Sequence, residues 1–149
     1  MRDLVERAKE LAYRAHAGQT DKAGCPYIEH VARVAAAVSD DPEAEAVAWL
    51  HDVLEDCRHM PEWMEVMEFR PMAIALNAMH LCRENFTSDD FYYENLRRHH
   101  LALRVKLADI ADNSDEARLA LLDDKTASRL RRKYAKARQA LQEATDGGR

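Results

Sequence analysis

Glycine and cysteine are scarce in this sequence, and each scarcity excludes a kind of site. Only 4 of the 149 residues are glycine, and Gly147 and Gly148 stand at the end of the chain. A glycine-rich phosphate-binding loop of either common type is therefore excluded. The 3 cysteines are an odd number without a CxxC pair. This disfavours a disulfide framework and fits a protein of the reducing cytoplasm.

The chain also lacks long apolar runs and a basic excess. No run approaches the ~18 apolar residues that span a membrane, and the first six residues lack the apolar block of a signal peptide. The 22 Lys and Arg against 27 Asp and Glu give a net charge of −5, which argues against a nucleic-acid partner. The length suits one globular domain. We expect this domain over residues 1–145 and a disordered tail over 146–149.

What the chain does contain is apolar residues at helical spacing, and no segment alternates as a strand does. The sequence therefore predicts an all-α bundle of about seven helices, whose ends are set by proline, glycine and Ser/Asp clusters. These helices include one that Pro26 opens and those over residues 3–17, 42–54, 61–68, 71–83, 89–98, 99–111 and 123–144. The last is basic on one side, and we interpret this side as a solvated face rather than a functional basic patch.

The segment 42–54 is the most informative, because it is apolar around nearly its whole circumference and should be buried. Its C-terminal end nevertheless carries His51, Asp52, Glu55 and Asp56. Buried carboxylates without partners cost several kcal/mol, and near a helix C-terminus they oppose the helix dipole. A bound divalent cation would offset both effects. The alternative interpretation is an exposed, charged helix end.

Two further segments each place a polar residue where the core is expected. His30 falls one turn into a helix that Pro26 opens, and Asp109 lies among the apolar residues of 103–113. A lone buried histidine is more often a hydrogen-bonded core residue than a ligand. Together with His51 and Asp52, however, these residues offer two imidazoles and two carboxylates. That donor set suits Mn²⁺, Fe²⁺, Co²⁺ or Zn²⁺.

The order and separation of these motifs resemble the HD-domain superfamily of metal-dependent phosphohydrolases. The similarity is strongest to the hydrolase domain of RelA/SpoT-type enzymes and their small stand-alone forms, which remove the 3′-pyrophosphate of guanosine tetra- and pentaphosphate. The matching segments are residues 15–19, 22, 24–30, 49–56 and 105–109. The resemblance implies a helical HD domain, one bound metal ion, usually Mn²⁺, and a small nucleotide as substrate.

The resemblance also implies a role for each motif residue. It assigns metal binding to the four residues His30, His51, Asp52 and Asp109. It assigns catalysis to Glu55 and Asp56, which would orient or deprotonate the attacking water and handle the proton of the leaving group. It assigns substrate contacts to Lys22, Asn113 and Tyr134.

Departures from the family pattern leave the substrate open. Asp21 stands where the family has an arginine that packs against guanine, and Asp115 and Glu116 replace Arg and Thr. Asp21 puts guanine recognition in doubt, and Asp115 and Glu116 would repel a polyphosphate unless Arg118 compensates. The alternatives are therefore a phosphatase or nucleotidase of another nucleotide, and a non-catalytic nucleotide- or metal-binding module. The oligomeric state is also open, and a homo-oligomer is one option.

Overall fold

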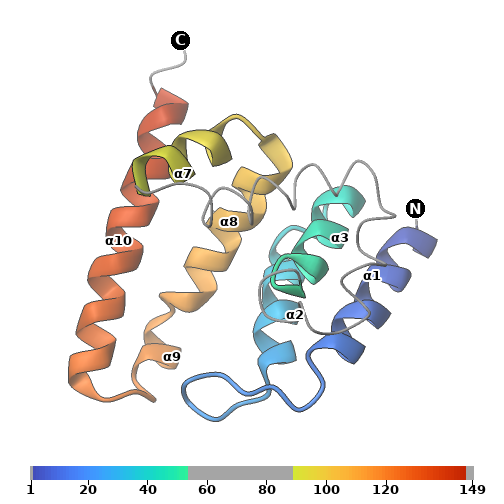
Figure 1. The fold of residues 1–149 in the computed structure, drawn as a ribbon, viewed down its shortest axis with the longest axis horizontal. Helices are drawn as coiled ribbons and strands as arrows, with labels where there is room; N and C mark the ends of the chain where they lie inside the picture. The colour runs from blue at the N-terminus through green and yellow to red at the C-terminus, as the bar shows by residue number, and fades with distance from the viewer. Residues whose placement is uncertain (1, 54–88, 147–149) are drawn as a thin grey trace.

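The computed structural model describes residues 2–53 and 89–146, and within these ranges the chain is all-α (Figure 1). The predicted fold class is thus confirmed. The helices are α1 (Arg2–Ala15), α2 (Tyr27–Ala37), α3 (Pro42–Leu50), α7 (Asp89–Arg97), α8 (His100–Asn113), α9 (Glu116–Leu119) and α10 (Asp124–Asp146). The helices predicted over 61–68 and 71–83 lie outside the described residues.

Turn-forming residues set the helix boundaries where the sequence predicts them. Gly18 adopts a φ of 80° in the loop after α1, a conformation that glycine adopts without steric penalty. Pro26 precedes the first residue of α2. Asp41 caps α3, because its side chain accepts a hydrogen bond of 3.0 Å from the backbone N–H of Glu43, and Pro42 occupies the first helical position.

The end of α3 differs from the prediction, since the helix ends at Leu50 rather than near Leu54. The imidazole Nδ1 of His51 lies 2.5 Å from the carbonyl oxygen of Ala48. An uninterrupted helix would offer that oxygen to the backbone N–H of Asp52. His51 and Asp52 form a turn instead. The predicted helical pairing with Glu55 and Asp56 stays a prediction, because those two residues lie outside the described ones.

Helix α9 is absent from the prediction, because a single turn of four residues has too short an apolar pattern to recognise. Asp115 caps it by accepting a hydrogen bond of 3.3 Å from the backbone N–H of Arg118. At the other end of the chain, α10 continues to Asp146, and residues 147–149 lie outside the described part.

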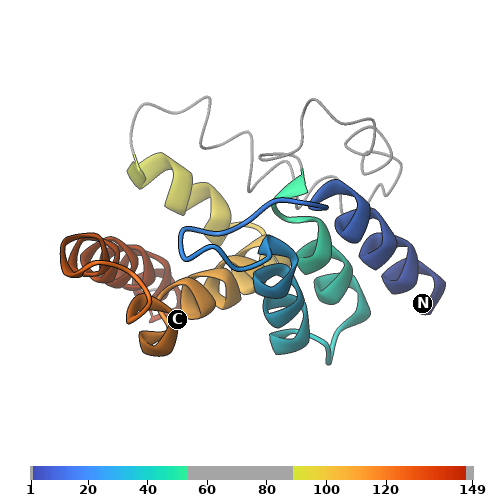
Figure 2. The same cartoon turned by 90° about the horizontal axis from the view of Figure 1, so that it is seen from below.

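Helix α8 occupies the centre of the molecule (Figures 1 and 2). It contacts α2 and α3 on one side, and α7 and α10 on the other. The faces predicted to be inner are buried, including Ala8, Leu11 and Ala12 of α1 and every residue of α3 from Ala46 to Leu50. Full burial of an apolar side chain such as Leu50 contributes about 1.5–3 kcal/mol. The core therefore forms around the helices that carry the candidate ligands.

A second, smaller apolar cluster joins α9 to α10. It consists of Leu119, Ala127 and Leu130, with Leu122 and Tyr134 packed against it. On the outer side of α10 the basic residues Lys125, Arg129 and Arg132 are exposed, as the solvated-face interpretation expects. No helix among the described residues is long and apolar enough to cross a membrane.

Candidate metal centre

The structure brings the four predicted metal ligands together from three separate parts of the chain. His30 lies on α2, His51 and Asp52 follow α3, and Asp109 lies on α8. One ligand atom from each residue lies within 4.8 Å of those of the other three. Both imidazoles and Asp109 are at most 5% exposed. We call these four residues the His/Asp cluster.

The two histidine Nε2 atoms indicate what the His/Asp cluster is suited to hold. Both are buried and make no hydrogen bond to a described residue. Carboxylate oxygens lie close to them, at 3.1 Å from His30 Nε2 to Asp109 Oδ1 and 2.9 Å from His51 Nε2 to Asp52 Oδ2. Buried polar atoms are normally hydrogen-bonded. A divalent cation that accepts both nitrogen lone pairs and both carboxylates would satisfy all four groups.

The other nitrogen of each histidine is held by the protein. His51 Nδ1 faces the backbone oxygen of Ala48, which can only accept a hydrogen bond, so in the neutral imidazole Nδ1 carries the proton and Nε2 keeps its lone pair. His30 Nδ1 lies 2.6 Å from Asp112 Oδ2. A hydrogen bond from the second ring nitrogen to a carbonyl or carboxylate is the usual way in which a metal-binding histidine is oriented.

Both carboxylates of the His/Asp cluster also have partners. The hydroxyl of Tyr27 donates a hydrogen bond of 2.6 Å to Asp52 Oδ2. Lys106 Nζ lies 2.9 Å from Asp109 Oδ2, and Asn113 Nδ2 donates to Asp109 Oδ1 at 3.0 Å. Sequence reasoning assigned no supporting role to Tyr27, Lys106 or Asp112. Lys106, which lies three positions before Asp109 on a predicted helix, could have been recognised from its spacing.

The cluster is electrostatically coupled. Burial alone would lower the pKa of His30 and of His51, but the carboxylates around them outweigh this effect, and both pKa values lie above the ordinary histidine value. Burial would likewise raise the pKa of Asp109, yet the Lys106 ammonium and the two imidazoles hold that pKa well below its usual range. The carboxylate is therefore ionised at neutral pH, as a metal ligand must be.

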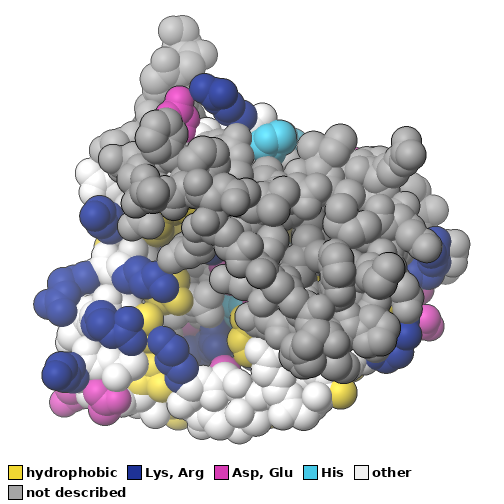
Figure 3. All heavy atoms as spheres, viewed as in Figure 1, with side chains coloured by type: hydrophobic (Ala, Val, Ile, Leu, Met, Phe, Trp, Pro, Cys, Tyr) yellow, Lys and Arg dark blue, Asp and Glu magenta, His cyan; other side chains and the backbone are white. Residues whose placement is uncertain are grey.

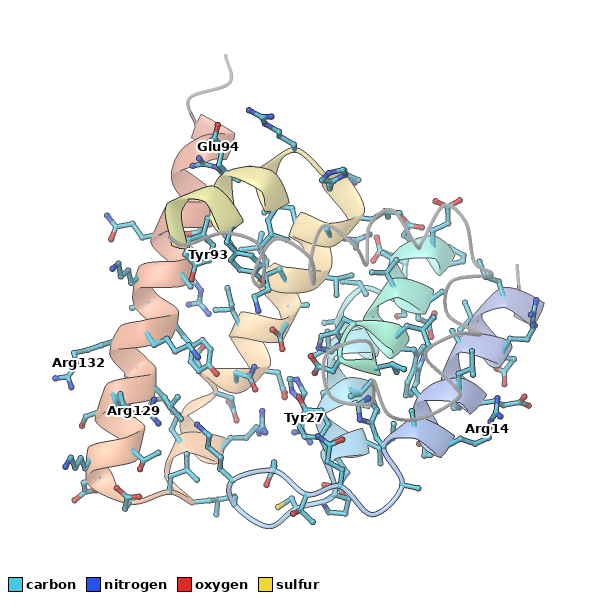
Figure 4. All side chains as sticks on the ribbon, viewed as in Figure 1. Arg14, Tyr27, Tyr93, Glu94, Arg129 and Arg132 are labelled. Carbon is cyan, nitrogen blue, oxygen red and sulfur yellow. The ribbon has the colours of Figure 1, made fainter. Side chains whose placement is uncertain are left out.

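A cavity of about 380 Å³ adjoins the His/Asp cluster. All three predicted substrate-contacting residues, Lys22, Asn113 and Tyr134, line it. The cluster residues themselves do not. Tyr27 and Asn113 connect the two, since both line the cavity and both bond to cluster carboxylates. Figure 4 shows Tyr27 at the start of α2, on the side that faces α8.

The walls of the cavity differ in character. One wall is the apolar cluster of α9 and α10, and the cations Lys22, Arg33 and Arg118 line the remainder together with acidic residues of α2 and the loop before it. Figure 3 shows Lys and Arg side chains gathered over α10 beside a hollow in this face. Figure 4 shows Arg132 of α10 pointing away from the bundle. An apolar wall beside cations suits a ligand that has both a ring and anionic groups.

The residues that depart from the family pattern are paired within the protein. Asp21 Oδ2 accepts a hydrogen bond of 3.2 Å from Arg118 Nη2. Asp115 caps α9, and Glu116 forms an ion pair of 2.9 Å with Arg131. Neither Asp115 nor Glu116 lines the cavity. The expected repulsion of a polyphosphate by these two carboxylates stays a prediction.

The fold and the His/Asp cluster together define an all-α protein with a buried candidate metal centre. No family model matches the chain. Among curated proteins, it is similar to a probable guanosine-3′,5′-bis(diphosphate) 3′-pyrophosphohydrolase of Synechocystis, at 36% identity over 74% of this chain and 16% of that protein. It is also similar to the enzyme named guanosine-3′,5′-bis(diphosphate) 3′-pyrophosphohydrolase of Vibrio cholerae, at 43% identity over 37% of this chain and 8% of that protein.

A third relative is a GTP pyrophosphokinase of Streptomyces coelicolor, at 40% identity over 37% of this chain and 7% of that protein. The chain belongs to the RelA/SpoT-type HD phosphohydrolase family. It spans 16% or less of the length of each of these relatives.

Proposed function

We propose that this chain is a Mn²⁺-dependent phosphohydrolase that removes the 3′-pyrophosphate of guanosine 3′,5′-bis(diphosphate), and that residues 1–145 form its catalytic domain. One observation carries the proposal. Two histidines and two aspartates from three parts of the chain converge in a buried cluster beside a cavity that is lined by cations. The names of the Synechocystis and Vibrio relatives supply the substrate.

In the proposed mechanism, His30, His51, Asp52 and Asp109 hold one divalent ion. When bound, such an ion lowers the pKa of its water toward about 7 and polarises a phosphoryl oxygen. Water attacks the phosphorus next to the ribose 3′ oxygen. The 3′ O–P bond breaks, and pyrophosphate and guanosine 5′-diphosphate are released. Glu55 and Asp56 are the proposed groups that orient this water and move its proton.

The cavity residues bind the rest of the substrate in this proposal. Lys22 and Arg33 neutralise phosphate charge, and Tyr134 with the apolar wall contacts the base. Asn113 keeps Asp109 in place through its hydrogen bond while it faces the nucleotide. Positioning and charge neutralisation of this kind supply most of the acceleration in phosphoryl transfer.

The pairing of Asp21 with Arg118 favours one alternative substrate class. A carboxylate occupies the position at which the family resemblance places a guanine-contacting arginine. The second candidate function is therefore that of a nucleotidase or phosphatase, in which the same metal centre cleaves another phosphorylated nucleotide.

The test is release of phosphate and pyrophosphate from guanosine 3′,5′-bis(diphosphate), deoxynucleoside mono- and triphosphates and NADPH, with Mn²⁺ or EDTA. We compare the wild type with Asp52→Asn, which removes a cluster charge, and with Asp40→Asn. The control removes an exposed carboxylate whose partner is Arg104. Mn²⁺-dependent pyrophosphate release from the tetraphosphate, lost in Asp52→Asn only, supports the proposal. If a different nucleotide is turned over instead, that nucleotide replaces guanosine 3′,5′-bis(diphosphate) as the proposed substrate. If Asp52→Asn turns the substrate over as fast as the wild type does, the mechanism is wrong. Metal binding without any turnover favours a binding module.

A further inference from the structure

Asp112 connects the His/Asp cluster to the cavity through its two carboxylate oxygens. Oδ2 lies 2.6 Å from His30 Nδ1 and accepts a second hydrogen bond of 2.8 Å from Arg118 Nη1. Oδ1 accepts a hydrogen bond of 2.8 Å from Arg33 Nε. One carboxylate is therefore shared between a candidate metal ligand and two arginines.

The two arginines face the ligand space, whereas His30 does not. Arg33 and Arg118 line the cavity, and Asp112 stands behind them. The His30 side chain is 1% exposed, and that of Arg118 is 22% exposed. Asp112 thus links Arg118, which a ligand in the cavity can reach, to His30 of the metal centre through two hydrogen bonds, and Arg118 Nη1 also lies 3.4 Å from His30 Nδ1.

We propose that Asp112 is a positioning residue that orients His30 for metal binding, and that Arg118 makes this effect depend on whether an anion occupies the cavity. The inference rests on the proposed metal-binding role of the His/Asp cluster. The negative charge of Asp112 strengthens Nε2 of His30 as a donor, because a carboxylate on the second ring nitrogen increases the basicity of the ligand. Arg118 withdraws part of that charge from the shared oxygen.

Arg118 has a second anionic partner that a ligand can replace. Its Nη2 pairs with Asp21, a carboxylate on the loop that borders the cavity. An anion that engages Arg118 from the cavity neutralises the guanidinium and leaves more negative charge of Asp112 for His30. Metal affinity then rises when the anion binds, and by linkage the metal increases the affinity for the anion by the same factor.

The first experiment measures Mn²⁺ affinity, from the spectroscopic signal of free Mn²⁺, for the wild type, Asp112→Asn and the control Asp40→Asn. Asp40 also pairs with an arginine but does not contact the cluster. We expect Asp112→Asn to bind Mn²⁺ about 10- to 100-fold more weakly, the usual effect of losing such a partner. We expect the control to bind like the wild type. Unchanged affinity in Asp112→Asn overturns the inference.

The second experiment tests the connection to the cavity with sulfate as the probe anion, against chloride at equal ionic strength. In the wild type, sulfate should tighten Mn²⁺ binding by at least about fivefold. Arg118→Gln should lose this response, and in chloride it should bind Mn²⁺ at least as tightly as the wild type. A purely structural role for Arg118 would instead weaken Mn²⁺ binding in Arg118→Gln, as it does in Asp112→Asn.

The outcomes separate this inference from the proposed function. If the wild type binds no Mn²⁺, the metal role of the His/Asp cluster is wrong. If the wild type binds Mn²⁺ but sulfate acts equally on the wild type and on Arg118→Gln, or on neither, only the connection through Asp112 and Arg118 is wrong. Thermal unfolding of each variant identifies any that has failed to fold. If Arg118→Gln fails to fold, Arg118→Lys, which keeps the charge, replaces it. We expect Arg118→Lys to show a partial response to sulfate.

Discussion

His51 shows how much one side chain decides at the residue scale. Its Nδ1 bonds to the carbonyl of Ala48 where α3 ends, and its Nε2 is directed into the His/Asp cluster. The same carbonyl also accepts the backbone N–H of His51, at 3.5 Å. The contact between His51 Nδ1 and the Ala48 carbonyl therefore orients the imidazole as a candidate metal ligand.

The raised histidine pKa values lead to a prediction about proton release. Nearby carboxylates raise the pKa of His30 and of His51 above the ordinary histidine value in the metal-free protein, so each imidazole holds a proton to higher pH than a free histidine does. A metal ion binds only neutral imidazole. We therefore expect Mn²⁺ binding to release protons at pH 7 and Mn²⁺ affinity to rise with pH, until the raised pKa values are passed. Calorimetry in buffers of different ionisation enthalpy measures this release, and a buffer-independent heat would contradict it.

A second residue-scale prediction concerns Asp21. Its Oδ1 accepts hydrogen bonds of 2.9 Å from the backbone N–H groups of Ala23 and Cys25, and its Oδ2 pairs with Arg118. Asp21→Asn keeps an oxygen for the loop and removes the charge next to Arg118. We expect its KM for an anionic nucleotide to fall by about two- to fivefold, the size of effect that a partly exposed ion pair produces. A higher KM at unchanged kcat would show that Asp21 contacts the substrate itself.

At the scale of elements, short capping signals hold the helices that present the cluster. Asp41 caps α3, whose end carries His51 and Asp52, and Asp115 caps α9, which carries Arg118. Each cap satisfies backbone N–H groups that the first turn of a helix leaves without partners. A substitution that removes either cap should therefore shift the site residues that its helix carries.

Removing the cap of α3 tests this view. We expect Asp41→Ala to lower the free energy of unfolding by about 1 kcal/mol, which corresponds to a fall in Tm of roughly 2–4 °C for a chain of this size. The neighbouring variant Asp40→Ala removes an exposed carboxylate whose partner among the described residues is Arg104. Its free energy of unfolding should stay close to that of the wild type. Equal losses in the two variants would mean that the cap is not what stabilises α3.

At the scale of the whole molecule, α8 joins the two halves of the fold. It packs on α2 and α3 through one side and on α7 and α10 through the other. Its buried Asp109 meets His30 and His51 from the other half, at 3.1 and 3.4 Å from their Nε2 atoms. A cation held there would tie three distant parts of the chain to one another.

Metal binding should for this reason stabilise the native state. At a free Mn²⁺ concentration of about 100 times Kd, linkage adds about 2.7 kcal/mol. We expect a rise in Tm of roughly 5–10 °C for the wild type, reversed by EDTA. Differential scanning calorimetry of Asp52→Asn is the control. If that variant gains as much from Mn²⁺ as the wild type, the ion acts somewhere else.

Much of this protein follows from its sequence, because helical periodicity and turn chemistry are local properties. The spacing of apolar residues predicts the helices that carry His30 and Asp109, and the apolar circumference of 42–54 predicts the burial of α3. The four residues of the His/Asp cluster also follow, since a polar side chain at a core position needs a partner wherever the fold places it.

Only the tertiary structure decided which partners those residues meet. The pairing of Asp112 with His30 spans 82 positions, and that of Arg118 with Asp21 spans 97. Contacts across such separations depend on how whole helices pack, which no local pattern encodes. The early end of α3 is a related case, because the contact between His51 and Ala48 competes with the helix through a side-chain orientation that periodicity does not contain. The sequence thus determined which groups are buried, and packing determined how they are oriented and joined to the cavity.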